Sequence, residues 1–311
     1  MRKKFYDLGK VIGLIVITAF LSGCSKMVVL NPKGPVGSEE RFLIYMAFGL
    51  MLIVIIPVFV MVFWFAAKYR ASNKKANYDP KWTDSAKVEF VIWVVPILIV
   101  AALSYLTITR TSSLDPYKPL PSNVKPVRVE VVSLDWNWLF IYPDYNIASV
   151  NELVFPEKTP LSFKLTSASV MTSFFIPQLG SQMYAMAGMQ TQLNLLASDT
   201  GTFMGQNNEF SGHGYANMHF KAISKTPAEF EAWVKMVKQS PDSLSMKTYE
   251  HVSQPNVGYP VTTYSSVAPG LFNHIVGQFM EWMGREMKMK HMKMNGKPGS
   301  GPMNNKIMED N

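Results

Sequence analysis

One loop, Gly205–Met218, contains residue types from which proteins build metal sites. Glu209, His213 and Met218 lie close together in it. Imidazole and thioether groups suit copper, and a copper pair also needs soft thiolate ligands. The loop has no thiolate, because the single cysteine of the chain is Cys24. This pattern is typical of a metal-binding loop from which most ligands have been removed.

The composition permits a membrane protein with one or two folded domains. The chain has 311 residues, 48% of them hydrophobic, and a formal net charge of +8. Many basic residues lie in a short segment between two apolar runs and in the C-terminal tail. This distribution favours membrane topology over nucleic-acid binding, and no nucleic-acid partner is expected. One cysteine excludes an intrachain disulfide and multi-cysteine metal sites.

The N-terminus has the features of an export signal. The chain opens with Arg2, Lys3 and Lys4, and the apolar run Val11–Leu21 that follows is too short for an ordinary membrane span. Leu21-Ser22-Gly23-Cys24 resembles the bacterial lipobox. Residues 1–23 are therefore expected to be a lipoprotein signal peptide, and Cys24 to be lipidated, palmitate included. The alternative is an inert, buried Cys24 in an anchor that is not cleaved.

Two longer apolar runs predict a transmembrane hairpin. Phe42–Ala67 and Val88–Thr109 are long enough to cross a bilayer, and Pro57 and Pro96 should kink them. The charged residues between the two runs are mostly basic, so the positive-inside rule places this segment in the cytoplasm. Residues 24–110 are predicted to form a lipidated N-terminus and hairpin in the bacterial inner membrane. The C-terminal domain is expected in the periplasm.

Glu89 is the one charged residue in the second run. A carboxylate at the cytoplasmic end of a span can be a solvated interfacial charge. Ionisable groups at membrane depth also mark ion pathways, so Glu89 is a candidate for proton entry into a partner subunit. The residues alone leave both interpretations open.

Residues 111–225 predict an all-β sandwich. The proline-rich segment Asp115–Pro121 is typical of a stiff linker, and alternation of apolar and charged residues begins at Val127. Several short runs separated by turn residues favour a sandwich of about a hundred residues. The predicted strands are Val127–Val131, Trp138–Tyr142, Leu161–Thr166, Phe174–Ile176, Gln192–Ala197 and Met218–Ile223.

Residues 226–285 predict a small, mostly helical module. Thr226-Pro227-Ala228-Glu229 forms a capping box that starts a helix. Residues 242–267 are expected to be irregular, and Gly270–Met287 is expected to hold a last helix. Residues 286–311 are expected to be a disordered tail rich in Met and Lys.

The order of these features resembles subunit II of the haem–copper terminal oxidases. The resemblance extends from Arg41 to Ile223 and is carried by the Gly205–Met218 loop and two other motifs. These are Asp135-Trp136-Asn137-Trp138 and Ile176-Pro177-Gln178-Leu179-Gly180. It implies a cupredoxin-like sandwich, with oxidase subunit I as principal partner, subunits III and IV as further partners, and the lipid bilayer around the hairpin.

Family members that oxidise cytochrome c hold a two-copper centre in this sandwich, and the resemblance implies that it is lost here. Its ligands are two His, two Cys, a Met and a Glu backbone carbonyl. The corresponding positions, in chain order, are Thr172, Asn207, Glu209, Ser211, Tyr215 and Met218. Only Glu209 and Met218 match, and His213 and His219 lie off the ligand positions. No metal or other cofactor is therefore expected in this chain.

The stretches Ser169–Pro177 and Ser181–Gln190 resemble the quinol-oxidising, cytochrome bo-type branch, as does the module from Thr226 to Met283. This implies a proton-pumping enzyme that oxidises ubiquinol and reduces O2 to water. Haems, one copper and most quinol contacts are expected in subunit I. This chain is expected to be a non-redox structural and assembly subunit, with no catalytic residue of its own.

The resemblance also bears on single residues and on two Met-rich runs. Glu89 matches a carboxylate near the mouth of the K proton pathway. Trp136 matches an aromatic electron relay, for which packing or docking is expected in the absence of copper. Met183–Met189 is interpreted as an interface with subunit I. Met287–Met294 is either a solvated tail or a Cu(I) site.

Two rival functions share some of these features. A cytochrome c oxidase subunit II would need the missing cysteine pair. A free-standing lipoprotein that delivers copper through Met-rich segments would be isolated alone, without other subunits.

Overall fold

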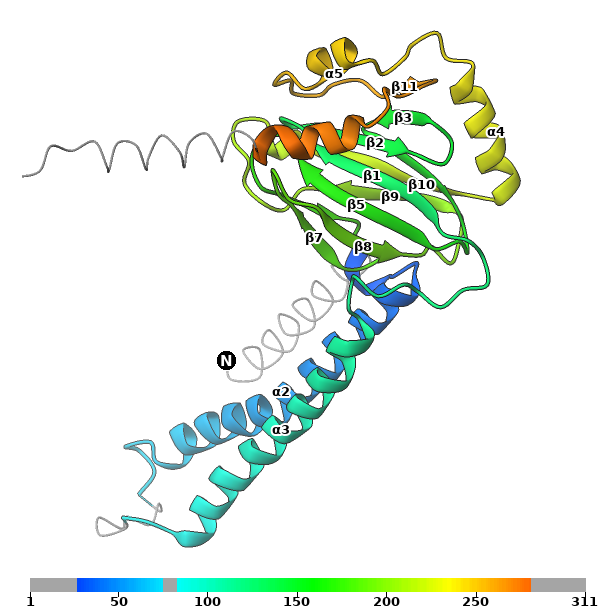
Figure 1. The fold of residues 1–311 in the computed structure, drawn as a ribbon. Helices are drawn as coiled ribbons and strands as arrows, with labels where there is room; N and C mark the ends of the chain where they lie inside the picture. The colour runs from blue at the N-terminus through cyan, green and yellow to red at the C-terminus, as the bar shows by residue number, and fades with distance from the viewer. Residues whose placement is uncertain (1–26, 75–82, 281–311) are drawn as a thin grey trace, which may run out of the picture.

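The computed structural model describes residues 27–74 and 83–280. Cys24 and the Met- and Lys-rich tail lie outside these residues. After a short 3-10 helix, η2 (Val28–Leu30), come two long helices, α2 (Pro35–Lys68) and α3 (Ala86–Ser113). The two predicted apolar runs lie within these helices, which form a hairpin below the rest of the molecule (Figure 1). The predicted helical hairpin is thus confirmed.

The hairpin presents apolar side chains to its surroundings on all sides. Phe63 is 69% exposed, Trp93 70% and Ile108 73%. A helix that is apolar all round is stable when lipid or another protein covers it. Pro57 lies inside α2 and Pro96 inside α3, and Figure 1 shows α2 bending away from α3 toward its C-terminal end.

The predicted β-sandwich is confirmed. One sheet has the order β11-β3-β2-β1-β5-β8 and the other β4-β10-β9-β6-β7. Within the first sheet β1 pairs antiparallel with β2 and parallel with β5. The strands are β1 Val127–Ser133, β2 Trp138–Tyr142, β3 Ile147–Val150, β4 Glu152–Pro156, β5 Leu161–Ser167, β6 Thr172–Phe175, β7 Gln182–Ala185, β8 Thr191–Leu195, β9 Gly201–Gln206, β10 His219–Lys225 and β11 Thr262–Tyr264.

Aromatic rings fill the space between the sheets. Trp138, Phe140, Phe163, Phe174 and Phe220 are all buried in one cluster. Phe174 of one strand stacks on Phe220 of another, with ring centroids 5.2 Å apart and planes at 10°. Burial of such rings is a large stabilising contribution, and it gives the sandwich a continuous apolar core.

The C-terminal segment covers the outer face of the six-stranded sheet. Leu244, Tyr249 and Phe272 form a second cluster with Leu139 and Ile141 of β2. Both faces of β2 are thereby covered, which explains why all five of its residues are buried although half-buried strands normally alternate.

Two helices within residues 226–280 were predicted, but the prediction for residues 242–267 was wrong. The capping box at Thr226 and Glu229 is present and starts α4 (Pro227–Lys238), and residues 271–280 are helical. Residues 242–267 are not irregular: they contain α5 (Met246–Val252) and β11, which pairs with β3 at the edge of the sandwich. A three-residue strand is too short to show a two-residue period, so pattern analysis missed it.

The first two turns of α2 are attached to the sandwich. The backbone N–H of Gly37 donates to the Leu179 carbonyl at 3.0 Å, and the Glu40 carboxylate accepts from the Ser181 N–H at 2.8 Å. A Cβ on Gly180, whose φ is +106°, would lie 2.6 Å from the Gly37 nitrogen. The Ile176–Gly180 motif therefore forms the contact that joins hairpin and sandwich.

Candidate functional site

The Gly205–Met218 loop connects two paired strands. β9 ends at Gln206 and β10 begins at His219, opposite it in the antiparallel register. The Asn207 N–H donates to the Met218 carbonyl at 3.1 Å, and this bond closes the base of the loop. Both ends of the loop are thus fixed by the sheet.

The side chain of Asn207 organises the loop interior. Its Oδ1 accepts from the N–H of Ser173 at 2.8 Å and from the N–H of Glu209 at 2.9 Å. Its Nδ2 lies 2.8 Å from the Glu209 carbonyl oxygen, 3.2 Å from Ser211 Oγ and 3.3 Å from Met218 Sδ. Four of the six predicted ligand positions therefore meet, and a side-chain nitrogen lies where they converge.

The other two predicted positions lie beside this centre. The Thr172 hydroxyl is buried and donates to Ser133 Oγ at 2.7 Å, away from the Asn207 amide. Tyr215 borders the same shallow surface cavity as Asn207 and Met218, about 320 Å³ in volume. Sequence reasoning missed Ser133 and Ser173, because a serine hydroxyl carries no motif that singles it out.

Trp136 holds the loop against the sandwich. Its Nε1 donates to the Ser211 carbonyl at 2.9 Å, and its backbone has φ = 72°. A Cβ on Gly214 would lie 2.4 Å from the indole ring, so only glycine permits this approach. His213 lies edge-on to the same ring, with centroids 6.3 Å apart. The indole ring of Trp136 thus packs against the His213 ring.

Exposed apolar side chains lie on or near the strands that contact the loop, β6 and β7. Val170, Met171, Tyr184 and Met189 lie on β7 or in the segments next to β6 and β7, and each is between 42% and 52% exposed. Phe210, in the loop itself, is 79% exposed. The loop and β6 are in direct contact through Asn207 and Ser173. Met183 packs against the core instead.

Glu89 lies far from the loop. It is an exposed residue in the first turn of α3, and its N–H donates to the Ser85 carbonyl at 2.9 Å. Figure 1 shows this end of α3 at the part of the hairpin most distant from the sandwich. Glu89 and the loop therefore do not form one site.

Comparison with known proteins defines the class first. Residues 143–224 match the family model of the cytochrome c oxidase subunit II periplasmic domain, and residues 238–283 match the COX aromatic-rich motif. The fold and the loop thus define a subunit II of an oxidase. A crystal structure of the periplasmic domain of a cytochrome oxidase subunit II from Bradyrhizobium japonicum has 24% identity and a TM-score of 0.36. The match covers 38% of this chain and 96% of the Bradyrhizobium japonicum chain.

Two curated relatives narrow the class. The cytochrome bo(3) ubiquinol oxidase subunit 2 of Pseudomonas aeruginosa is 52% identical over 86% of this chain and 80% of its own length. The ubiquinol oxidase subunit 2 of Acetobacter aceti is 49% identical over 85% of this chain and 86% of its own length. The chain belongs to the family of ubiquinol oxidase subunit 2. The resemblance found in the sequence is confirmed, and the copper-delivery alternative is not favoured.

Proposed function

We propose that this chain is the non-redox subunit II of a proton-pumping ubiquinol oxidase, and that its sandwich has lost the two-copper centre. The observation that carries the proposal is the position of Asn207 Nδ2 among the Glu209 carbonyl, Ser211 Oγ and Met218 Sδ. These are atoms of four ligand positions, and Asn207 Nδ2 is hydrogen-bonded to each of the other three.

The chemistry of these atoms does not fit a copper pair. An amide nitrogen donates hydrogen bonds and has no free lone pair for a metal. The Glu209 carbonyl accepts from that amide, and a serine hydroxyl is a poor substitute for a bridging thiolate. Among the described residues, no three His, Cys, Asp or Glu side chains gather into a possible metal site.

Electrons would therefore enter the complex elsewhere. Ubiquinol oxidation and oxygen reduction, with the haems and one copper, belong in this proposal to subunit I. The apolar surface around Phe210 would be covered by subunit I, and the exposed faces of α2 and α3 by subunit I, subunits III and IV or lipid. Lipidation of Cys24 would add a further membrane anchor.

Metal reconstitution tests the copper-free assignment. The complex is purified through this chain, stripped of loosely bound metal and incubated with Cu(I) and Cu(II). No absorption or electron paramagnetic signal of a mixed-valence copper pair should develop. A stoichiometric signal of that type, lost on Met218→Leu, would show that the loop holds copper and would refute the proposal.

A second part of the proposal concerns Glu89, for which we infer proton delivery toward subunit I. An exposed carboxylate at the cytoplasmic start of a membrane helix supports this role. Glu89→Gln should slow oxygen consumption with ubiquinol while haem content stays unchanged. Asp84→Asn, a neighbouring exposed carboxylate outside α3, is the matched control. Equal rates for both variants would leave Glu89 as a solvated interfacial charge.

A further inference from the structure

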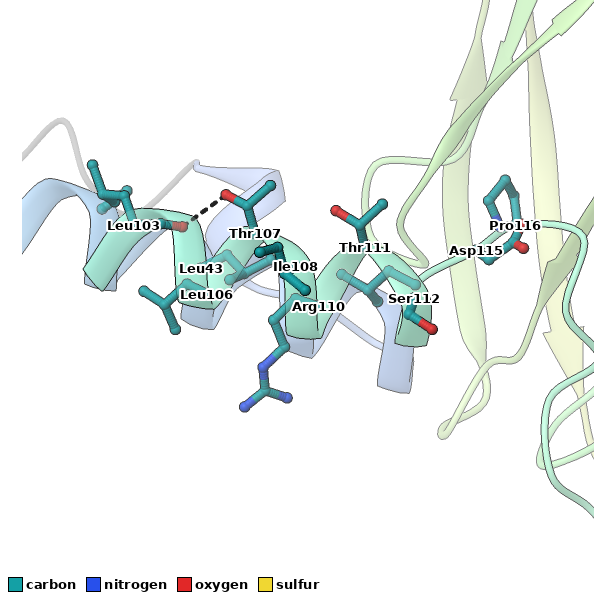
Figure 2. A pocket seen from close by; sticks show the side chains of 12 residues that line it. Leu43, Leu103, Leu106, Thr107, Ile108, Arg110, Thr111, Ser112, Asp115 and Pro116 are labelled. Carbon is teal, nitrogen blue, oxygen red and sulfur yellow. Dashed lines mark hydrogen bonds between the residues drawn. The ribbon is translucent and has the colours of Figure 1, made fainter. Parts of the chain in front are cut away.

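A groove runs between α2 and α3 at the ends of the helices nearest the sandwich. It has a volume of about 940 Å³. Its walls include Leu43 and Ala47 of α2 and Leu103 and Leu106 of α3. Figure 2 shows Leu43, Leu103 and Leu106 on the helical part of the groove, whereas Asp115 and Pro116 lie at the other end, next to the strands. The groove is therefore apolar toward the membrane interior and polar toward the periplasm.

The polar end of the groove carries charges of both signs. Arg110 Nη1 lies 2.7 Å from Glu39 Oε2, and the guanidinium carbon lies 5.4 Å from the centroid of the Phe42 ring. A guanidinium has five N–H donors, and the Glu39 contact uses one of them. Asp115 borders both this groove and the adjoining cavity, which Lys118 also borders.

We propose that this groove binds one phospholipid with a zwitterionic headgroup that carries a primary ammonium, phosphatidylethanolamine. An acyl chain lies between α2 and α3, the phosphate contacts the free N–H groups of Arg110, and the ammonium contacts Asp115. The proposal depends on insertion of the hairpin into a membrane, and it does not depend on the loss of copper.

The charges select this headgroup over an anionic one. Among the described residues that line the groove, Arg110 and Asp115 are the charged ones, so its polar end carries one charge of each sign. A headgroup with adjacent phosphate and ammonium complements that pattern, whereas phosphatidylglycerol leaves Asp115 facing a phosphate without a cation.

Photocrosslinking in the intact complex identifies the occupant. Ala47 is replaced by p-benzoylphenylalanine, the membranes are illuminated, and adducts on the purified chain are measured by mass spectrometry. The same replacement at Ala101, which is exposed on α3 and does not border the groove, is the matched control. Position 47 should carry a phosphatidylethanolamine adduct enriched over position 101. A crosslink to another polypeptide, or equal lipid adducts at both positions, would overturn the proposal.

Two substitutions test the headgroup contacts. Arg110→Gln should lower the retained phosphatidylethanolamine about tenfold, the loss expected for one charge-assisted hydrogen bond. Asp115 lies outside α3, and its Oδ1 accepts a hydrogen bond from the Tyr117 N–H at 3.0 Å. Asp115→Asn keeps an oxygen that can accept this bond. It should abolish the preference for phosphatidylethanolamine over phosphatidylglycerol in exchange experiments. An unchanged preference in Asp115→Asn contradicts the proposal even if Arg110→Gln does not assemble.

Discussion

The carboxamide of Asn207 fixes the shape of the Gly205–Met218 loop, in which we propose that a copper centre has been lost. A metal would hold groups from four positions together, and here one carboxamide binds to the same groups. Because an amide offers both a donor and an acceptor, it satisfies the Ser173 and Glu209 N–H groups on one side and the Glu209 carbonyl on the other. The loop is thereby fixed by hydrogen bonds within the protein.

Replacement of Asn207 by leucine should destabilise the sandwich. The side chains have similar size, but leucine leaves the buried Ser173 N–H without its acceptor. The free energy of unfolding should fall by about 3 kcal/mol, and the apparent Tm of the purified protein should fall by about 6 °C or more. Asn208→Leu, at an exposed neighbouring position, should change stability by about 0.5 kcal/mol or less. Similar Tm values for both variants would show that Asn207 does not organise the loop.

At the scale of elements, the joint between α2 and the sandwich depends on glycine. Gly180 has φ = +106°, and any Cβ there would overlap the Gly37 backbone. Gly180→Ala should cost about 1–2 kcal/mol for the left-handed backbone alone, and the overlap should weaken the Gly37–Leu179 hydrogen bond. The yield of assembled complex should therefore fall. Gly49→Ala, in α2 with open space around it, should assemble normally.

The start of α4 gives a pH dependence of defined sign. Hydrogen bonds from the Thr226 side chain and backbone hold the pKa of Glu229 below its ordinary value. The stability contributed by the ionised carboxylate is complete above the unfolded pKa, about 4.3. It is lost as pH falls through the lower, folded pKa.

Glu229→Gln tests this directly. The variant should be less stable than the parent at neutral pH, and the difference in Tm should shrink as the solution is acidified through the folded pKa. Thr226→Ala, which removes the N-cap side chain, should lower the free energy of unfolding by about 1 kcal/mol at neutral pH. A difference between Glu229→Gln and the parent that does not change with pH would exclude the ionised capping contact.

Elements with strong local signals were predictable, and short or doubly covered ones were not. The two long apolar runs and the capping box at Thr226 defined α2, α3 and the start of α4. β3 and β4 are adjacent, short and buried on both faces, so their residues show no alternation. The positions around Asn207 were placed by resemblance, but the Thr172–Ser133 pair required coordinates, because contacts between distant strands leave no local pattern.

At the scale of the whole molecule, the C-terminal segment forms part of the core. Ending the chain after residue 240 would expose Leu139 and Ile141 on the outer face of β2. We expect this truncation to abolish assembly of the oxidase, measured by the haem that co-purifies. Ending the chain after residue 285 removes the Met- and Lys-rich tail, and it should leave both haem and copper content unchanged. Copper lost with the tail alone would identify the tail as a metal site.

In the proposed function, electrons reach the complex from ubiquinol and not through copper in this chain. The most direct measurement is oxygen consumption by the complex purified through this subunit, with ubiquinol and with reduced cytochrome c as alternative donors, alongside copper and haem content. We expect consumption with ubiquinol alone and no copper beyond that of subunit I. Consumption with cytochrome c, together with additional copper that depends on Met218, would contradict it.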